Sequence, residues 1–329
     1  MTLLEVDDLR VTFSRKGSPD FTAVDGVSFD VEAGEVVGLV GESGCGKSVT
    51  SLAVMGLLPR RSARVSGSVR FDGTDLLTAS PAQLARRRGK DLAMVFQDPM
   101  TSLNPVLTLG RQLTEVLRAH TGLDRAAARK EAVELLGRVG IPDPRRRVGE
   151  YPHQLSGGMR QRVLIAIALA CSPRLIIADE PTTALDVTIQ AQVLDLLTGL
   201  VRESGTAMVL ITHDLGVVAG TCDRVNVLYA GKVVEQAPRA ELFARPRHRY
   251  TEGLLAAVPR VDAPEGVALR PVPGSVQDRL PWDVGCAFAP RCGVADDACR
   301  TGAIGLDAAG GPVAHSARCV HPAELEVSR

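Results

Sequence analysis

The stretch EVVGLVGESGCGKSVTSLAVMGLL, residues 35–58, decides the fold of this 329-residue chain. It begins with a short apolar run, breaks at glycines, and continues with apolar residues at helical spacing through Leu52, Met55 and Leu58. That order predicts a strand, a loop and a helix.

The loop fits the phosphate-binding pattern G-x-x-x-x-G-K-[ST]. Glycines let backbone N–H groups converge on phosphate oxygens at the positive end of a helix. Lys47 would place its charge on the β and γ phosphates, and Ser48 would offer a hydroxyl to Mg²⁺. The plain alternative is a glycine-rich turn with an exposed lysine, but the strand and helix that the motif requires are both predicted. We expect Cys45 to be a small filler rather than a reactive thiol. The expected nucleotide-binding residues are Gly41, Glu42, Ser43, Gly44, Cys45, Gly46, Lys47, Ser48 and Val49.

A second stretch, RLIIADEPTTALD at residues 174–186, supplies acids to the same chemistry. Its apolar run is typical of a buried parallel strand, and carboxylates at the end of such a strand face the ligand crevice. We expect Asp179 to hold Mg²⁺, directly or through water, and Glu180 to polarise the water that attacks the γ-phosphate. Two acids that simply end a strand before Pro181 are the alternative, which the upstream phosphate loop disfavours.

Composition and charge narrow the class of protein. Lys and Arg number 38, as do Asp and Glu, so the zero net charge implies no bulk attraction to nucleic acid or to an acidic membrane. The acidic start MTLLEVDDLR lacks the features of a secretory signal, which predicts that the chain stays in the cytosol. The longest apolar run, residues 163–171, is about half of the ~20 residues that cross a bilayer, so any membrane role requires a partner.

The stretch LSGGMRQR, residues 155–162, together with the two motifs above resembles the ATP-binding subunits of ABC transporters. The stretches VFQDPMTSLNP at 95–105 and PGSVQDRLPWDVGCAFAPRC at 273–292, with the methionine of LSGGM, resemble the ATPases of oligopeptide and dipeptide importers. The resemblance covers nearly the whole chain. It implies an α/β fold with an ABC-type nucleotide-binding domain: a RecA-like core, an antiparallel β subdomain and a helical subdomain, plus a small cysteine-containing C-terminal domain.

The resemblance also implies domain limits, which the composition of the chain supports. The ABC ATPase domain would span residues 1–240, with its helical subdomain at about 98–165, and the C-terminal peptide-importer region would span 241–329. Alternating apolar residues over 2–36 predict an antiparallel sheet, and three-and-four spacing over about 107–141 predicts helices. In the resembled family the helical subdomain grips a short cytosolic helix of the membrane subunit.

Three further residues take roles from the family around the bound nucleotide. Gln97 would be the glutamine that senses Mg²⁺ or the attacking water, and His213 the switch histidine at the γ-phosphate. Phe13 would stack on adenine, with Phe21 as a competitor. A structural histidine and a core phenylalanine are the alternatives.

The signature motif takes its role from the family's dimeric arrangement. Ser156, Gly157 and Gly158 would contact the ATP held by the opposite ATPase subunit, and Asp186 would cross that interface. A serine and two glycines also open a helix whose N-terminus binds anions. An ordinary helix cap is the alternative for both Ser156 and Asp186.

The tail concentrates cysteines with the spacing C-x5-C-x6-C-x19-C. The tight C-x2-4-C pairs of structural zinc sites are missing from this pattern, whereas a cubane iron–sulfur cluster is less restricted in ligand spacing. Family members with this pattern are associated with a [4Fe-4S] cluster. We expect such a cluster. A Zn²⁺ ion is one alternative, and four thiols that bind no metal are the other. We do not expect His315 or His321 to replace a cysteine as ligand. The expected ligands are Cys286, Cys292, Cys299 and Cys319.

The resemblance thus predicts an ATPase that powers uptake of di- or oligopeptides, using ATP and Mg²⁺, from the cytoplasmic face of the membrane as a peripheral subunit. Its partners would be a second ATPase subunit that is a distinct paralogue, two transmembrane permeases and an extracytoplasmic peptide-binding protein, with no nucleic acid. Import of nickel or another solute is the alternative within the class. A soluble ABC ATPase outside transport is disfavoured because the chain has one cassette and no long coiled-coil insertion.

Overall fold

The computed structural model of the chain describes residues 2–14, 17, 19–183, 185–258, 272–276, 284–308 and 315–323. Residues 277–283, part of the tail stretch that carries the resemblance, lie outside the described residues. The described residues form two compact units, and neither is a continuous stretch of chain. Unit one contains residues 31–35 and 78–211, and unit two contains residues 2–30, 36–77 and the described residues after 211. The phosphate loop and the cysteine-bearing tail therefore fold within the same unit.

One sheet of unit two confirms the strands predicted near the N-terminus. It orders its strands β2 (Phe21–Glu32), β1 (Thr2–Phe13), β4 (Ala63–Phe71) and β5 (Thr74–Asp75), and β1 runs antiparallel to β4. Leu4 and Val6 are buried before the register shift between Asp7 and Arg10, Leu9 is buried within it, and Val11 is buried after it. A bulge shifts the alternation by one residue, so even-numbered and then odd-numbered side chains face the same core.

The second sheet of unit two joins the phosphate loop to the tail. Its strands lie in the order β11 (Asp307–Ala308), β12 (Ser316–Ala317), β10 (Lys232–Pro238), β9 (Arg224–Tyr229) and β3 (Val36–Val40). β3 and β9 are parallel, whereas β10 pairs antiparallel with β9 on one side and with β12 on the other. The tail strands thus extend the sheet whose strand β3 leads into the phosphate loop.

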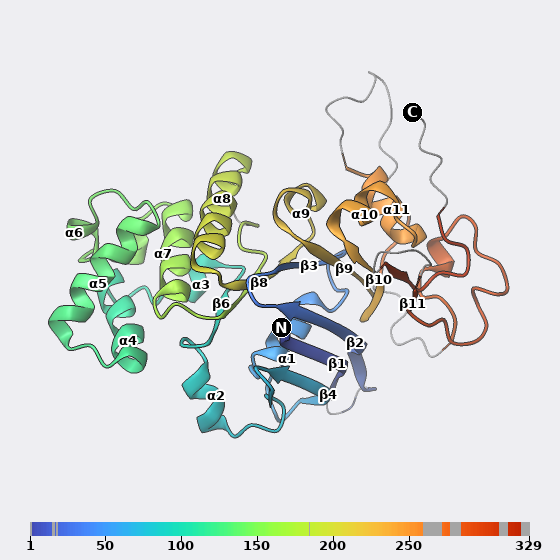
Figure 1. Ribbon diagram of the computed structural model, residues 1–329, viewed down its shortest axis with the longest axis horizontal. Helices are drawn as coiled ribbons and strands as arrows, with labels where there is room; N and C mark the ends of the chain where they lie inside the picture. Colours follow the sequence, from blue (N-terminus) through green and yellow to red (C-terminus); the bar gives the residue numbers. More distant parts are fainter. Residues whose placement is uncertain are drawn as a thin grey trace, which may run out of the picture. The chain divides into compact units, whose positions relative to one another are not determined.

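Helices α1 (Lys47–Val54), α9 (Leu215–Thr221), α10 (Arg239–Ala244) and α11 (Arg249–Ala256) belong to unit two, with a 3-10 turn, η2, at Ala289–Arg291. Every residue of β3 is buried, as expected for a parallel strand that is covered on both faces. Figure 1 shows α10 and α11 near β10, which places the segment after residue 238 beside the sheet.

Unit one is built on three parallel strands, β6 (Leu92–Val95), β7 (Leu175–Asp179) and β8 (Ala207–Thr212), with β7 in the middle. All five residues of β7 are buried, which confirms the buried strand predicted before the two acids. The two short helices α2 (Pro81–Arg87) and α3 (Pro99–Ser102) flank β6 in sequence.

The helices predicted over about 107–141 are present in unit one as α4 (Leu109–Thr121) and α5 (Arg125–Arg138). They gather with α6 (Pro144–Arg147) and α7 (Gly157–Leu169), coloured green in Figure 1. Thr108 and Asp124 cap the first two helices through side-chain bonds to the backbone of Arg111 and Ala127. The apolar stripes of α4 and α5 are buried, so the helical subdomain has its own small core.

The longest described helix, α8 (Val187–Ser204), packs buried apolar residues against its unit. Its apolar positions lie on one side, with Val193, Leu197 and Val201 fully buried. Across the described residues, no helix combines the length and the apolar character that a bilayer span requires.

Candidate nucleotide site

The phosphate loop between β3 and α1 requires glycine at two positions for steric reasons. Gly41 and Gly46 have φ of +151° and +102°. A Cβ added at Gly41 would lie 2.2 Å from the carbonyl oxygen of Leu228, and one at Gly46 would lie 2.7 Å from that of Ala23. The backbone of neighbouring strands therefore approaches the loop so closely that a side chain is excluded, as the predicted phosphate loop needs.

Lys47, the first residue of α1, is only 4% exposed and turns back over the loop. Its Nζ donates to the carbonyl oxygens of Gly41 at 2.7 Å and Glu42 at 3.0 Å. The Cys45 thiol is fully buried, and burial raises its pKa despite the nearby Lys47 charge. Cys45 is thus a neutral buried side chain, in agreement with the predicted filler, while Ser43 and Gly44 are exposed at the loop tip.

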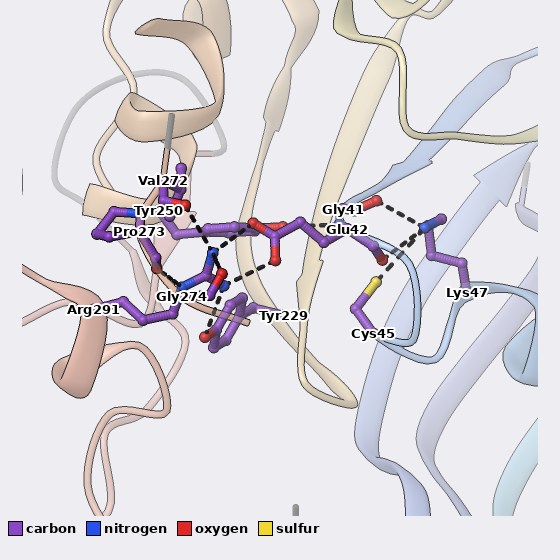
Figure 2. Close-up of polar contacts among 10 residues, drawn as sticks. All are labelled: Gly41, Glu42, Cys45, Lys47, Tyr229, Tyr250, Val272, Pro273, Gly274 and Arg291. Carbon is purple, nitrogen blue, oxygen red and sulfur yellow. Dashed lines mark hydrogen bonds and ion pairs between the residues drawn. The ribbon is translucent and has the colours of Figure 1, made fainter. Parts of the chain in front are cut away.

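Glu42 is the loop residue whose surroundings the sequence did not reveal. Its carboxylate receives two hydrogen bonds from the guanidinium of Arg291, at 2.8 and 2.9 Å, and its backbone N–H donates to the Tyr250 hydroxyl at 2.9 Å (Figure 2). Burial raises the pKa of Tyr250 well above its usual range, so this hydroxyl is neutral. Although burial alone lowers the pKa of Arg291, its hydrogen bonds to Glu42 and Tyr229 raise it overall, so the guanidinium is charged. Glu42 therefore faces the tail.

In unit one, Glu180 follows the end of β7 in a left-handed conformation, with φ of +45°. Its backbone N–H donates to the carbonyl oxygen of Ile211 at 2.9 Å, which holds this turn in place. Its Oε2 accepts hydrogen bonds from Gln97 Nε2 at 2.9 Å and from the Thr183 hydroxyl at 2.8 Å. Asp179, the last residue of β7, is 6% exposed.

The structure thus brings two predicted residues of unit one, Gln97 and Glu180, into direct contact. It also adds Thr183, which the sequence reasoning missed. The available signal was the hydroxyl three residues after Glu180 in the stretch DEPTT. Two donors on one oxygen fix the direction of the carboxylate, and a fixed carboxylate is what a residue that orients water requires.

The signature residues open helix α7. Ser156 is its N-cap and accepts a bond from the backbone of Met159 at 3.4 Å. A Cβ at Gly158 would lie 2.6 Å from Cγ2 of Ile189, so glycine allows α7 and α8 to approach closely. Asp186 caps α8 through Ile189 at 3.0 Å. Ser156 and Asp186 therefore both act as helix caps, which is the alternative that the sequence left open, and their roles across a dimer stay predictions.

The remaining predicted site residues belong to the ends of strands. His213 is exposed directly after β8. Phe13 is half-buried at the end of β1, whereas Phe21 is 44% exposed at the start of β2. Partial exposure at a strand end leaves both rings available for stacking, so the choice between them stays a prediction.

The four tail cysteines influence one another. The pKa of Cys286 is raised to about 11, first by burial and also by the thiols of Cys319 and Cys299. The pKa values of Cys299 and Cys319 are raised too, mainly by burial, and Cys292 contributes to each. The backbone N–H of Cys286 also donates to the carbonyl oxygen of Cys299 at 2.7 Å, and the iron–sulfur cluster on these four cysteines stays a prediction.

Part of the same tail offers a second set of ligand atoms. Asp296, Cys299 and His321 place one ligand atom each within 4.8 Å of one another, and His321 Nε2 lies 2.9 Å from Asp296. Sulfur, imidazole and carboxylate are ligands that a single zinc ion accepts. His321 was not expected as a ligand from the sequence, and its place beside Cys299 gives the zinc alternative a specific set of residues.

A buried glutamate holds the tail against β10. Glu235 is fully buried and accepts hydrogen bonds from the backbone N–H groups of Arg247 at 2.6 Å and His248 at 2.9 Å, with His315 Nε2 at 2.7 Å. The Nε2 atom of His315 is thus engaged by Glu235. Burial lowers the pKa of His248 to about 4, so its ring is neutral.

Comparison with known proteins agrees with this geometry. Residues 24–183 match the family model of the ABC transporter, and residues 234–299 match that of the oligopeptide/dipeptide transporter C-terminal region. The chain is 51% identical to the oligopeptide transport ATP-binding protein OppD of Salmonella typhimurium, over 91% of this chain and 88% of that protein. It is 53% identical to the dipeptide transport ATP-binding protein DppD of Bacillus subtilis, over 88% and 86%. It is 51% identical to a putative peptide import ATP-binding protein of Brucella melitensis, over 98% of both chains.

Two solved structures resemble the fold. One is the ATP-binding cassette MJ0796 in a dimeric post-hydrolysis state bound to ADP and Pi, with a TM-score of 0.64, 30% identity, and coverage of 72% of this chain and 98% of that one. The other is cbiO1 from Clostridium perfringens, part of the cbiONQ ABC transporter complex, with a TM-score of 0.62, 28% identity, and coverage of 74% and 91%.

Proposed function

This chain belongs to the ATP-binding subunits of ABC-type oligopeptide and dipeptide transporters, and we propose from that membership how its residues work. Its fold is that of an ABC ATPase, followed by the C-terminal region of peptide transporters. It binds ATP and hydrolyses it to power peptide import. The relatives reported above are named for oligopeptide transport, dipeptide transport or peptide import, which supports peptide import over import of nickel or another solute.

The observation that carries the catalytic proposal is the Glu180 carboxylate with two donors on one oxygen. Gln97 and Thr183 both donate to Oε2, which fixes the direction of the carboxylate that we assign to the attacking water. Glu180 would accept or polarise the water's proton as the oxygen attacks the γ-phosphorus, with ADP as the leaving group. His213 would contact the γ-phosphate.

Ser48, Gln97 and Asp179 are the residues we assign to Mg²⁺. All three carry hard oxygen atoms, the ligands that this ion prefers. The amide nitrogen of Gln97 donates to Glu180, so its amide oxygen is the atom for the ion. The ion would neutralise charge on the β and γ phosphates, and Lys47 would add a further positive charge.

The proposed partners follow from membership in the family. The subunit would pair with a second ATPase, a distinct paralogue, and dock with two permeases at the cytoplasmic face of the membrane, where a peptide-binding protein delivers the cargo outside. Ser156, Gly157, Gly158 and Asp186 would contact the nucleotide of the opposite ATPase. The solved dimer of a related cassette supports a two-subunit arrangement.

The variant Glu180→Gln tests the catalytic assignment in the assembled transporter. The amide keeps the size of the side chain but cannot accept a proton, so we expect MgATP binding to persist, turnover to be lost and the closed state to accumulate. Phosphate release and nucleotide binding are measured side by side. Glu203→Gln, an exposed change in α8, is the matched control. Full hydrolysis by Glu180→Gln would remove Glu180 from this role.

We also propose that Cys286, Cys292, Cys299 and Cys319 hold a [4Fe-4S] cluster. A backbone hydrogen bond of 2.7 Å from Cys286 to Cys299 joins two of the cysteine-bearing loops, which supports this proposal, and the cluster would cross-link loops of the tail and supply one-electron redox chemistry there. Protein purified without oxygen should be brown, absorb near ~400 nm and release iron and sulfide. Colourless protein with one zinc per chain would instead support the set Asp296, Cys299 and His321.

A further inference from the structure

Arg291 uses its whole guanidinium to join the tail to the phosphate loop. Both terminal nitrogens reach Glu42, Nη1 at 2.8 Å and Nη2 at 2.9 Å, in a two-pronged ion pair. The other N–H groups donate to the Tyr229 hydroxyl at 3.2 Å, and to carbonyl oxygens of residues 272–274. The Arg291 side chain is 7% exposed and that of Glu42 is 28% exposed. The arginine is mostly buried and the two-pronged pair has few alternative geometries, unlike a fully exposed surface salt bridge.

Glu42 in turn is held through each of its polar groups. Arg291 binds the carboxylate, Tyr250 accepts from the backbone N–H, and Lys47 donates to the carbonyl oxygen (Figure 2). The same Lys47 nitrogen also binds Gly41. The contacts that fix Glu42 therefore fix the resting place of the lysine that acts on the phosphates.

The attachment has a second route through aromatic packing. Phe288, three residues before Arg291, lies with its ring centroid 5.4 Å from Tyr229 and 5.5 Å from Tyr250. Cys286 Sγ lies 3.9 Å from His248 Nε2, and His248 Nδ1 accepts the backbone N–H of Tyr250 at 3.1 Å. The segment that begins at Cys286 is thus packed against the side chain that binds the loop backbone.

We propose that Arg291 is a positioning residue for nucleotide binding, which couples the cysteine-bearing tail to the phosphate loop through Glu42. The loop has glycine at positions 41, 44 and 46, and such a loop loses much conformational freedom when it closes on phosphates. A loop that the tail already holds in place loses less, and so binds nucleotide more tightly. The inference rests on the assignment of residues 41–48 as the phosphate loop.

The coupling must be reciprocal. If an ordered tail tightens nucleotide binding, bound nucleotide must order the tail by the same free energy. Hydrogen exchange in residues 286–300 should therefore slow when MgATP is added, although those residues lie outside the phosphate loop. This protection is a signature that a purely structural ion pair would not give.

The test compares Arg291→Gln and Glu42→Gln with Arg300→Gln in the full-length protein. Arg300 is a matched control because it is another tail arginine paired with an acid, Asp297, but is exposed. We expect Arg291→Gln and Glu42→Gln each to raise the Kd for MgATP about tenfold, within the range typical of coupled sites. The Kd of the double variant should be no higher than the higher of the two single-variant Kd values, because both changes break the same interaction. Arg291→Gln should also abolish the MgATP-dependent protection of residues 286–300.

Arg291→Lys guards against a variant that fails to fold. It keeps the charge but cannot make the two-pronged pair, so we expect an intermediate Kd and partial protection. Equal Kd values for Arg291→Gln and Arg300→Gln, or additive effects in the double variant, would overturn the coupling while the phosphate-loop assignment stands. Wild-type protein that binds MgATP no better than Lys47→Ala would instead overturn that assignment and this inference with it.

Discussion

Replacing Thr183 by valine removes one of the two hydrogen bonds that direct the Glu180 carboxylate. Valine has nearly the shape of threonine, so the change deletes the 2.8 Å bond to Oε2 and leaves the bond from Gln97. With one donor the carboxylate gains rotational freedom and spends less time in position to orient the water. Because Thr183 plays no part in binding ATP in this scheme, the loss should fall on kcat.

The size of the effect follows from the bond and its exposure. A hydrogen bond to a charged group contributes about 1.5–3 kcal/mol, and the exposed position of Thr183 lowers this to about 1–2 kcal/mol. If the full amount is expressed in the transition state, kcat falls roughly 5- to 30-fold. The assay is steady-state phosphate release by the transporter reconstituted with its permeases and binding protein, with nucleotide Kd measured separately.

Thr114→Val is the matched control. Thr114 is a helical threonine of α4 whose hydroxyl donates to the carbonyl oxygen of Arg111 at 3.0 Å, so its replacement also deletes one hydrogen bond. The reasoning is refuted if Thr183→Val has the same kcat as Thr114→Val. It is refuted equally if the Kd for MgATP rises while kcat stays constant, since that would place Thr183 in binding.

Two further predictions concern the phosphate loop. Gly46→Ala should weaken MgATP binding at least about tenfold, because the new Cβ would lie 2.7 Å from a backbone oxygen. Gly73→Ala is the control, because Gly73 also has a positive φ but has open space around it. It should lower the free energy of unfolding by only about 1 kcal/mol and leave the affinity for MgATP unchanged. Cys45 is buried and Cys171 is partly exposed, so Cys45 should react with iodoacetamide more slowly, as measured by mass spectrometry. Because burial raises the pKa of Cys45 above the ordinary 9.0, its reaction rate should keep rising up to pH 9. A rate that levels off below pH 8 would contradict a neutral thiol.

Local pattern was sufficient for much of the fold and of the site. The strand β3, the loop and α1 follow from glycine and apolar spacing within 24 residues, and the buried β7 follows from an apolar run that ends in two acids. The reason is physical: phosphate binding needs backbone N–H groups at a helix start, and few local sequences provide them. The helical region over about 107–141 was predicted from the three-and-four spacing of its apolar residues alone, and α4 and α5 confirm it.

Long-range contacts were beyond the reach of such patterns. Glu42 and Arg291 are 249 residues apart, and nothing in the spacing of either one indicates its partner. The compact units also mix distant stretches, because strand pairing and not chain order decides which residues share a core. Thr183 was missed for a different reason: its hydroxyl acts on Glu180 only because Glu180 adopts a left-handed turn, with φ of +45°, that propensity does not predict.

The phosphate-loop pattern itself explains why Glu42 is available to the tail. The pattern fixes glycines, a lysine and a hydroxyl residue, because phosphates contact backbone N–H groups and those few side chains. The side chains at the variable positions are not needed by the phosphates and can contact the rest of the protein. Glu42 occupies such a position, and its side chain meets Arg291 of the tail. A tail that acts through a variable position can alter the loop without removing a single phosphate contact, which is why we expect Arg291 to tune nucleotide affinity rather than abolish it.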